Sequence, residues 1–231
     1  MTTDFASSLD HVVAAPGVYA PQQDSRMLCE VMAQTRLVPG RRVADLCTGS
    51  GVVAIKAAAL GAASVTAFDV SDAAVRCARA NAHTSGVDVK VQLGTCSSAI
   101  AFAPFDVVVS NPPYVPTPPG VDAEAVPAQA GPAGAFNAGP DGRLVLDPLC
   151  AAAPQLVGPE GTLLVVQSEL SDVEASLALL RRGGLKASVV TRWWIPFGPV
   201  LEARAQWLEE VGLLRRDRRT EQLVVIRADA P

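Results

Sequence analysis

The sequence predicts an α/β fold with a mostly parallel sheet and helices on both faces. Short apolar, β-branched segments alternate with helical segments from residue 39 to the C-terminus, which is typical of a doubly covered parallel sheet. A glycine turn and polar residues follow these segments, as at the carboxyl edge of such sheets, where ligands bind. With 231 residues, 49% of them hydrophobic, the chain can form one sizeable core. We expect a single domain over residues 1–231.

The N-terminal half is expected to supply one helix and then four strands. The first helix lies within residues 18–37, with Asp24 and Ser25 as cap residues and apolar side chains at helical spacing. The next elements are strands at 39–46, 63–70, 87–94 and 105–110, with helices at 52–60 and 71–86.

The C-terminal half begins with a long irregular connection. Residues 116–140 are dominated by Pro, Gly and Ala, and so long a connection in a compact domain is usually functional. We interpret it as a substrate loop. The expected elements after it are a helix at 141–156 that Pro148 kinks or ends, strands at 161–168, 185–195 and 221–228, and helices at 171–184 and 200–214.

Charge and cysteine content argue against several classes of protein. A net charge of −4 gives no general attraction to a phosphate backbone. The five cysteines are scattered, without a C-x-x-C pair, so we expect free thiols in a reducing cytosol and no metal site. The N-terminus does not resemble a signal peptide, and no uncharged apolar run approaches ~18 residues. The expectation is a cytoplasmic protein that does not span a membrane.

A glycine turn and an acidic residue indicate a nucleoside-containing cofactor. "DLCTGSG" places Gly49 and Gly51 between the first strand and a helix, so that the backbone and helix N–H groups face a ligand. Asp69 ends the second strand, where its carboxylate can accept hydrogen bonds from ribose hydroxyls. Ala54 at the third glycine position does not exclude NAD. Asp45, before the turn, suits a cationic amino group and favours S-adenosylmethionine.

"NPPY" at residues 111–114 follows the buried fourth strand. Asn111 offers a side-chain carbonyl, and the carbonyl of Pro112 can point outward because neither proline has an N–H. These two acceptors can hold both hydrogens of a planar NH₂ group, and Tyr114 offers a flat face beside it. We expect orientation to dominate over base catalysis, and His11 and His83 lie in no motif.

These motifs resemble the Rossmann-like class I methyltransferases with an N-P-P-Y motif, and among them the HemK-like protein-glutamine methyltransferases. The likeness runs from "VYAPQQDS" to "GTLLVVQS" and is strongest to the short branch of that family. It implies a seven-stranded, mostly parallel sheet with the last strand antiparallel, S-adenosyl-L-methionine as cofactor, and methylation of the glutamine amide in the G-G-Q loop of a release factor. A small activator subunit is a further partner that the resemblance implies.

The resemblance also assigns roles to residues. Residues 1–40 would cover the cofactor, and Asn111, Pro112 and Tyr114 would hold the glutamine amide. The residues implied to line the cofactor site are Tyr19, Pro21, Ser25, Asp45, Cys47, Gly49, Gly51, Asp69, Val70, Thr95, Cys96 and Asn111.

The sequence departs from the family at three places. Cys47 replaces a usual glycine, and "GTCSS" leaves Thr95 and Cys96 where an acid usually binds the adenine amino group, so we expect weaker adenine binding. Residues 193–218 insert a Trp-containing helical segment, which either packs on its own core or serves as a cap over the substrate loop or a partner surface. Because of these departures, a small-molecule N- or O-methyltransferase remains an alternative function. An adenine-N6 methyltransferase of nucleic acid is disfavoured by the acidic balance, and a non-catalytic sensor by the N-P-P-Y motif.

Overall fold

The computed structural model describes residues 12–120, 126 and 131–231. They form one seven-stranded sheet in the order β3-β2-β1-β4-β5-β7-β6. The strands are β1 Arg42–Leu46, β2 Ser64–Asp69, β3 Lys90–Leu93, β4 Phe105–Ser110, β5 Val157–Ser168, β6 Lys186–Pro196 and β7 Thr220–Asp229. Only β7 runs antiparallel, to both β5 and β6, so the expected direction of the last strand is confirmed.

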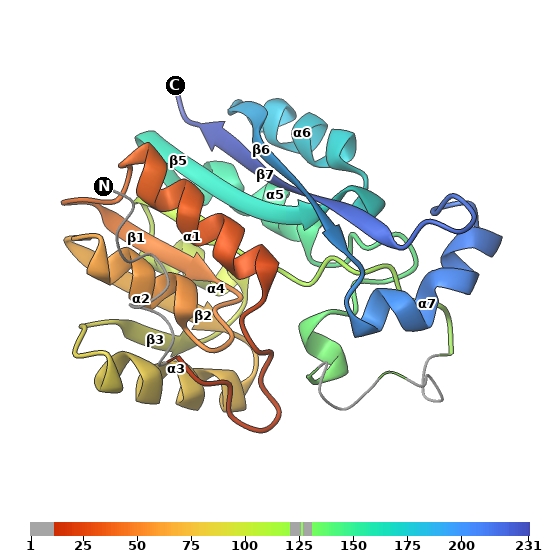
Figure 1. Cartoon of the computed structure of the whole chain (residues 1–231). Helices are drawn as coiled ribbons and strands as arrows, with labels where there is room; N and C mark the ends of the chain where they lie inside the picture. Colours follow the sequence, from red (N-terminus) through yellow and green to blue (C-terminus); the bar gives the residue numbers. More distant parts are fainter. Residues whose placement is uncertain (1–11, 121–125, 127–130) are drawn as a thin grey trace.

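Helices cover both faces of the sheet (Figure 1). One face carries α1 Gln23–Thr35, α2 Val52–Ala59 and α3 Asp72–Thr84, and the other carries α4 Cys96–Ala99, α5 Leu146–Leu156 and α6 Val173–Arg182. Because both faces are covered, the middle of β4 is apolar on both sides: Val107, Val108 and Val109 are all buried. None of the helices within the described residues is long and apolar enough to cross a membrane.

Three local expectations were wrong. Asp24 and Ser25 lie inside the first turn of α1, and Gln22 precedes the helix without a side-chain cap. Pro148 neither kinks nor ends α5, because it lies in the first turn, where its missing N–H would have no intrahelical partner. The short helix α4 was not expected, although Thr95 and Ser98 form a capping box at its start.

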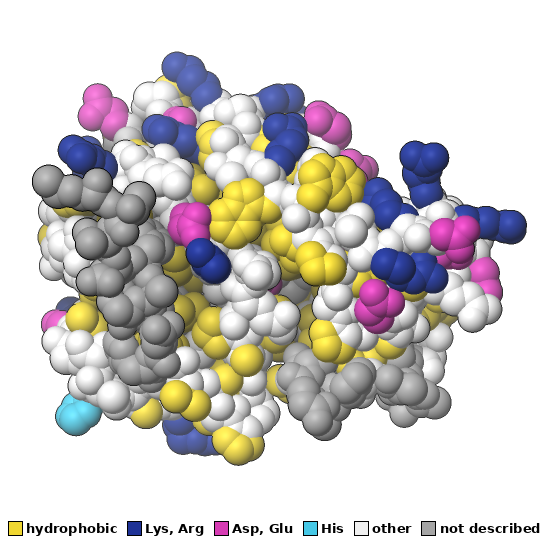
Figure 2. Space-filling model, viewed as in Figure 1, with side chains coloured by type: hydrophobic (Ala, Val, Ile, Leu, Met, Phe, Trp, Pro, Cys, Tyr) yellow, Lys and Arg dark blue, Asp and Glu magenta, His cyan; other side chains and the backbone are white. Residues whose placement is uncertain are grey.

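The inserted segment forms a lobe beside the carboxyl ends of the strands. Its helix α7, Pro199–Glu210, lies against the described parts of the loop 116–140. A small separate core supports it, formed by Leu170, Phe197, Leu201, Ala205, Leu208 and Leu214. Basic and acidic side chains are interspersed on the surface at this end of the molecule (Figure 2). The lobe therefore packs on its own core and also contacts the described parts of the loop, whereas its role as a cap over a substrate or as a partner surface stays a prediction.

Candidate functional site

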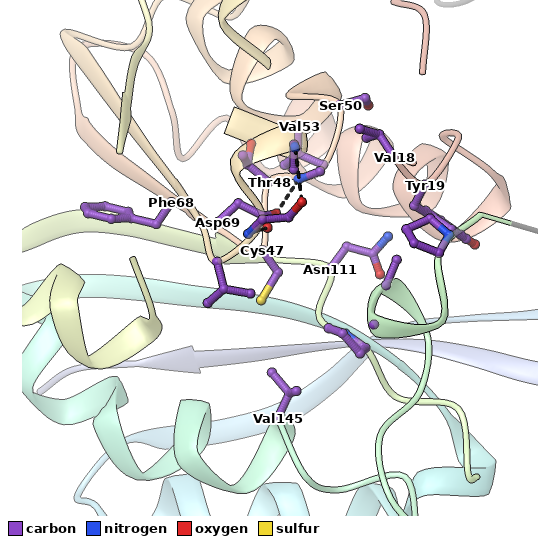
Figure 3. Close-up of a pocket in the computed structure, with 18 of the residues that line it drawn as sticks. Val18, Tyr19, Cys47, Thr48, Ser50, Val53, Phe68, Asp69, Asn111 and Val145 are labelled. Atoms are coloured by element: carbon purple, nitrogen blue, oxygen red, sulfur yellow. Dashed lines mark hydrogen bonds between the residues drawn. The ribbon is translucent and has the colours of Figure 1, made fainter. Parts of the chain in front are cut away.

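A cavity of about 520 Å³ lies at the carboxyl ends of β1, β2 and β4, where the parallel strands meet (Figure 3). The segment before α1 forms one side of it, and the described part of the loop 116–140 and the start of α5 form another. Ten of the residues expected at the site line this cavity: Tyr19, Pro21, Ser25, Cys47, Gly49, Asp69, Val70, Thr95, Cys96 and Asn111.

Asp45 holds the turn that follows β1. Its Oδ2 accepts hydrogen bonds from Thr48 Oγ1 at 2.6 Å and from the backbone N–H of Ala54 at 3.0 Å. Its Oδ1 is buried without a partner among the described residues, and burial raises the pKa of this carboxyl to about 7. Asp45 does not itself line the cavity. Its direct contact with a cationic ligand group stays a prediction, although the unpartnered oxygen fits such a group.

The two glycines of the turn have different roles. Gly49 lines the cavity with a φ of +56°, so its backbone can lie directly against a ligand. Gly51 has a φ of +84°, and a Cβ there would lie 3.0 Å from the Cβ of Ala78 on α3. Gly51 does not line the cavity and serves the close packing of the turn on α3.

Asp69 projects into the cavity from the end of β2 (Figure 3). Its Oδ2 accepts from the N–H of Gly49 and its Oδ1 from the N–H of Ser71, both at 2.9 Å. Because each carboxylate oxygen can accept more than one hydrogen bond, both oxygens can still accept from a pair of hydroxyls. The two backbone bonds fix the carboxylate in one orientation, as a ribose site requires.

Asn111 reaches the cavity wall from the end of β4 (Figure 3). Its Nδ2 donates to Ser25 Oγ at 3.2 Å, and Ser25 Oγ donates to Asp24 Oδ1 at 3.3 Å. Because the amide nitrogen of Asn111 is used in this pair of hydrogen bonds, its carbonyl oxygen remains as an acceptor for a ligand. Ser25 is therefore a positioning residue for Asn111 as well as part of the cavity wall.

Asp24 was missed as a functional candidate. It is buried, and its Oδ2 accepts from Tyr19 OH at 3.3 Å and from Tyr114 OH at 3.1 Å. Burial and the nearby Asp24 raise the pKa of both tyrosines, so both hydroxyls stay protonated and donate. The only sequence signal for Asp24 is its place in "VYAPQQDS", and from the sequence Asp24 is interpreted there as a helix cap.

Tyr114 and Pro112 lie differently from expectation. Tyr114 lines a second, smaller cavity on the far side of Tyr19, and Pro112 is buried and does not line the larger one. Pro113, in contrast, contributes to the wall of the larger cavity. A role of the Pro112 carbonyl as a second acceptor, and packing of Tyr114 beside the acceptor amide, stay predictions.

No acidic side chain follows β3 in the wall of the cavity. Thr95 caps α4 by accepting from the N–H of Ser98, and Cys96 contacts Cys47 across the cavity. That contact raises the pKa of the Cys47 thiol and lowers the pKa of the Cys96 thiol. Gly94 and Ser97 also line this end. An adenine amino group would therefore meet hydroxyl, thiol and backbone groups here.

Replacing Thr95 with aspartate is expected to tighten S-adenosylmethionine binding by about tenfold. Aspartate caps helices as well as threonine does, and an ionised acceptor strengthens a hydrogen bond by about 1–2 kcal/mol. Calorimetric titration of both proteins measures the difference. Nanomolar affinity of the unaltered protein would contradict the expected weak adenine binding. Thr95→Val, which removes the helix cap without adding a charge, is the control.

Other parts of the cavity were not anticipated. Its wall also includes residues of the segment before α1, the turn after β1, the end of β2 and the start of α5, namely Gly17, Val18, Thr48, Ser50, Phe68, Leu144, Val145 and Pro148. Those on irregular segments, such as Val18 and Leu144, follow no spacing pattern, so sequence reasoning could not find them. His83 is exposed on α3 away from the cavity, and His11 lies outside the described residues. In the described part of the chain, no group of three His, Cys, Asp or Glu could hold a metal ion.

Comparison with known proteins gives consistent matches. The Methyltransferase small domain family matches residues 10–123. A release factor glutamine methyltransferase of Deinococcus radiodurans is 36% identical over 171 residues, which cover 73% of this chain and 60% of that protein. A provisionally named protein N5-glutamine methyltransferase of Methanocaldococcus jannaschii is 27% identical, covering 82% of this chain and 92% of that one. The chain thus spans less than two thirds of the bacterial relative.

Solved structures share the fold. The Mtq2–Trm112 complex of E. cuniculi, described as responsible for methylation of the eRF1 termination factor, has a TM-score of 0.63 at 20% identity and covers 93% of this chain and 99% of that chain. The 16S rRNA N2 G1207 methyltransferase of T. thermophilus, solved with AdoMet and guanosine, has a TM-score of 0.61 at 18% identity, covering 94% and 46%. With the cavity, the glycine turn and the N-P-P-Y residues in place, the chain has the Rossmann-like methyltransferase fold and is similar, over about three quarters of its length, to the release factor glutamine methyltransferase described above.

Proposed function

We propose that this protein transfers a methyl group from S-adenosylmethionine to the side-chain amide of a glutamine in a peptide-chain release factor. The observation that carries the proposal is Asn111, whose amide nitrogen is held by Ser25 while its carbonyl oxygen remains at the wall of the large cavity. An acceptor oriented in this way suits a donor group on the substrate, and a primary amide has two N–H donors.

The residues around the cavity fit S-adenosylmethionine. The carboxylate of Asp69 suits the ribose hydroxyls, and the backbone at Gly49 lies open to the methionine portion. The apolar surfaces of Phe68 and Val70 line the cavity near Asp69 and suit the adenine ring. The volume of about 520 Å³ falls in the usual range for cofactor sites. When bound, this cofactor supplies a methyl group that its positively charged sulfur has already activated for transfer.

The protein's own contribution would be orientation and exclusion of water. An amide nitrogen is a weak nucleophile because its lone pair is delocalised, so alignment with the methyl group matters more than a strong base. Such alignment can contribute ~7 kcal/mol or more. In the balanced reaction the nitrogen–carbon bond forms, the sulfur–carbon bond breaks and one amide proton passes to solvent.

Two observations support glutamine in a release factor as the acceptor. The curated relatives at 32–36% identity carry release factor glutamine methyltransferase as their name, and Asn111 lines the cavity with a side-chain carbonyl that can accept a hydrogen bond from an amide. A small activator subunit is a candidate partner, because the similar Mtq2 structure is a complex with Trm112.

Transfer of labelled methyl from the cofactor to a purified release factor tests the proposal. We expect label on the wild-type factor and none on its G-G-Q to G-G-A variant, with or without an activator subunit. Unlabelled wild-type factor under both conditions would contradict the proposal. It would favour a small-molecule N- or O-methyltransferase, whereas label on adenine of a nucleic acid would favour the third alternative.

A further inference from the structure

A second cavity of about 110 Å³ lies beside the first. The ring of Tyr19 lines both cavities, and the second is closed further by Asp24 and Tyr114. Its opposite wall comes from the inserted segment, including the end of β6 and the start of α7, with Glu221 of β7 at its base. Asp24 connects it to the first cavity, because Asp24 accepts a hydrogen bond from Ser25 Oγ, which in turn accepts from the side-chain amide of Asn111.

The second cavity has an acidic floor. Asp24 and Glu221 each expose only 5% of their surface. The Oε2 atom of Glu221 is buried with no hydrogen-bond partner in the described structure, and burial raises the pKa of this carboxyl to about 7. The positive charge of Arg218, which does not line the cavity, lowers the pKa of Glu221. Arg218 also forms an ion pair with Glu169 at 2.8 Å.

The rim of the second cavity is exposed to solvent. Gln22 and Gln23 lie on one side of it, and Pro196 and Pro199 lie on the other. The N-terminus of α7 at this rim has no side-chain cap, so its N–H groups suit main-chain carbonyls of an arriving segment. A side chain can thus enter from the surface and reach the acidic floor.

We propose that this second cavity binds a lysine or arginine side chain of the protein substrate, next to the glutamine that is methylated. The proposal rests on the proposed function for the identity of the substrate. A buried carboxyl with an unpartnered oxygen gains most from an N–H donor that carries positive charge. A cation there would also offset the repulsion between Asp24 and Glu221, which line the same cavity. The cavity is too small for a nucleotide and large enough for the end of one long side chain.

Binding of L-argininamide tests the cavity without any methyl transfer. We expect saturable changes in backbone amide NMR signals at residues lining this cavity, such as Gln23 and Leu223, and loss of these changes in Glu221→Gln. Glu210→Gln, an exposed acid on α7, makes the same change in net charge and should leave them intact. Signals that do not respond, or that respond equally in Glu221→Gln, would overturn the proposal.

A double-mutant cycle with the release factor tests the partner. Each Lys and Arg flanking the target glutamine is replaced by Gln in turn, and KM and kcat are measured with wild-type enzyme and with Glu221→Gln. We expect one replacement to raise KM about tenfold with wild-type enzyme and to have little further effect with Glu221→Gln, at unchanged cofactor affinity. Additive effects for every replacement would overturn the proposal while the proposed function stands. If the wild-type factor is never methylated, the proposed function is wrong. The argininamide titration then tests by itself whether the second cavity binds a cationic side chain.

Discussion

Replacement of Asn111 by alanine is expected to lower methyl transfer by about 100- to 1,000-fold while leaving S-adenosylmethionine affinity within a few-fold. The variant removes the carbonyl oxygen that we propose holds the substrate amide, and the loss of one oriented polar group in an active site has effects of this size. Asp69 and Gly49, at the cofactor side of the cavity, keep their hydrogen bond. Single-turnover kinetics with labelled cofactor measure the transfer, and calorimetry measures the affinity.

Ser25→Ala provides the matched comparison. It keeps Asn111 but removes the hydroxyl that accepts from Nδ2, so the amide can rotate. We expect an intermediate loss of about tenfold, mostly in kcat. An Asn111→Ala enzyme that turns over at a normal rate would refute the assignment of Asn111, and equal losses in both variants would indicate general damage to the cavity.

Replacement of Arg204 by alanine is expected to detach the described parts of the loop 116–140 from α7 and to lower the free energy of unfolding by about 3 kcal/mol. Arg204 is almost fully buried. Its guanidinium donates to the carbonyl of Pro116 at 2.9 Å and to Asn137 Oδ1, and stacks over the Phe136 ring at 5.4 Å. Buried acceptors left without a donor cost about 1–3 kcal/mol each.

Arg204→Ala should weaken binding of the protein substrate more than binding of the cofactor. The loop contributes Pro132, Gly134 and Ala135 to the wall of the large cavity, so we expect KM for the protein substrate to rise more than cofactor affinity falls. Thermal unfolding and steady-state kinetics measure the two effects. Arg215→Ala changes an exposed arginine of the same inserted segment and should leave both unchanged. An Arg204→Ala protein as stable and active as wild type would contradict an anchoring role.

The sequence was most informative where a backbone pattern and a function coincide. The alternation of strands and helices predicted the sheet, and the strand ends predicted that Asp69 and Asn111 would face one cavity, because parallel strands bring their carboxyl ends to one edge. Gly49 was found for a similar reason, since its turn must approach the ligand. These inferences needed only local order along the chain.

What the sequence could not show depends on contacts between distant segments. Arg204 joins a helix to a loop 88 positions earlier in the chain, and Glu221 and Asp24, far apart in the sequence, line the same small cavity. A buried arginine on a helix has the same local signature as an exposed one, because burial depends on the packing partner. For the same reason Asp24 was interpreted as a helix cap and not as the acceptor shared by Tyr19 and Tyr114.

A crystal structure with S-adenosylhomocysteine and a glutamine-containing release-factor fragment tests the central claim most directly. It should place the glutamine amide nitrogen within hydrogen-bond distance of Asn111 Oδ1, with the Asn111 nitrogen still on Ser25 and the cofactor ribose on Asp69. A glutamine amide bound away from Asn111, or an Asn111 oxygen turned into the protein interior in that complex, would contradict it.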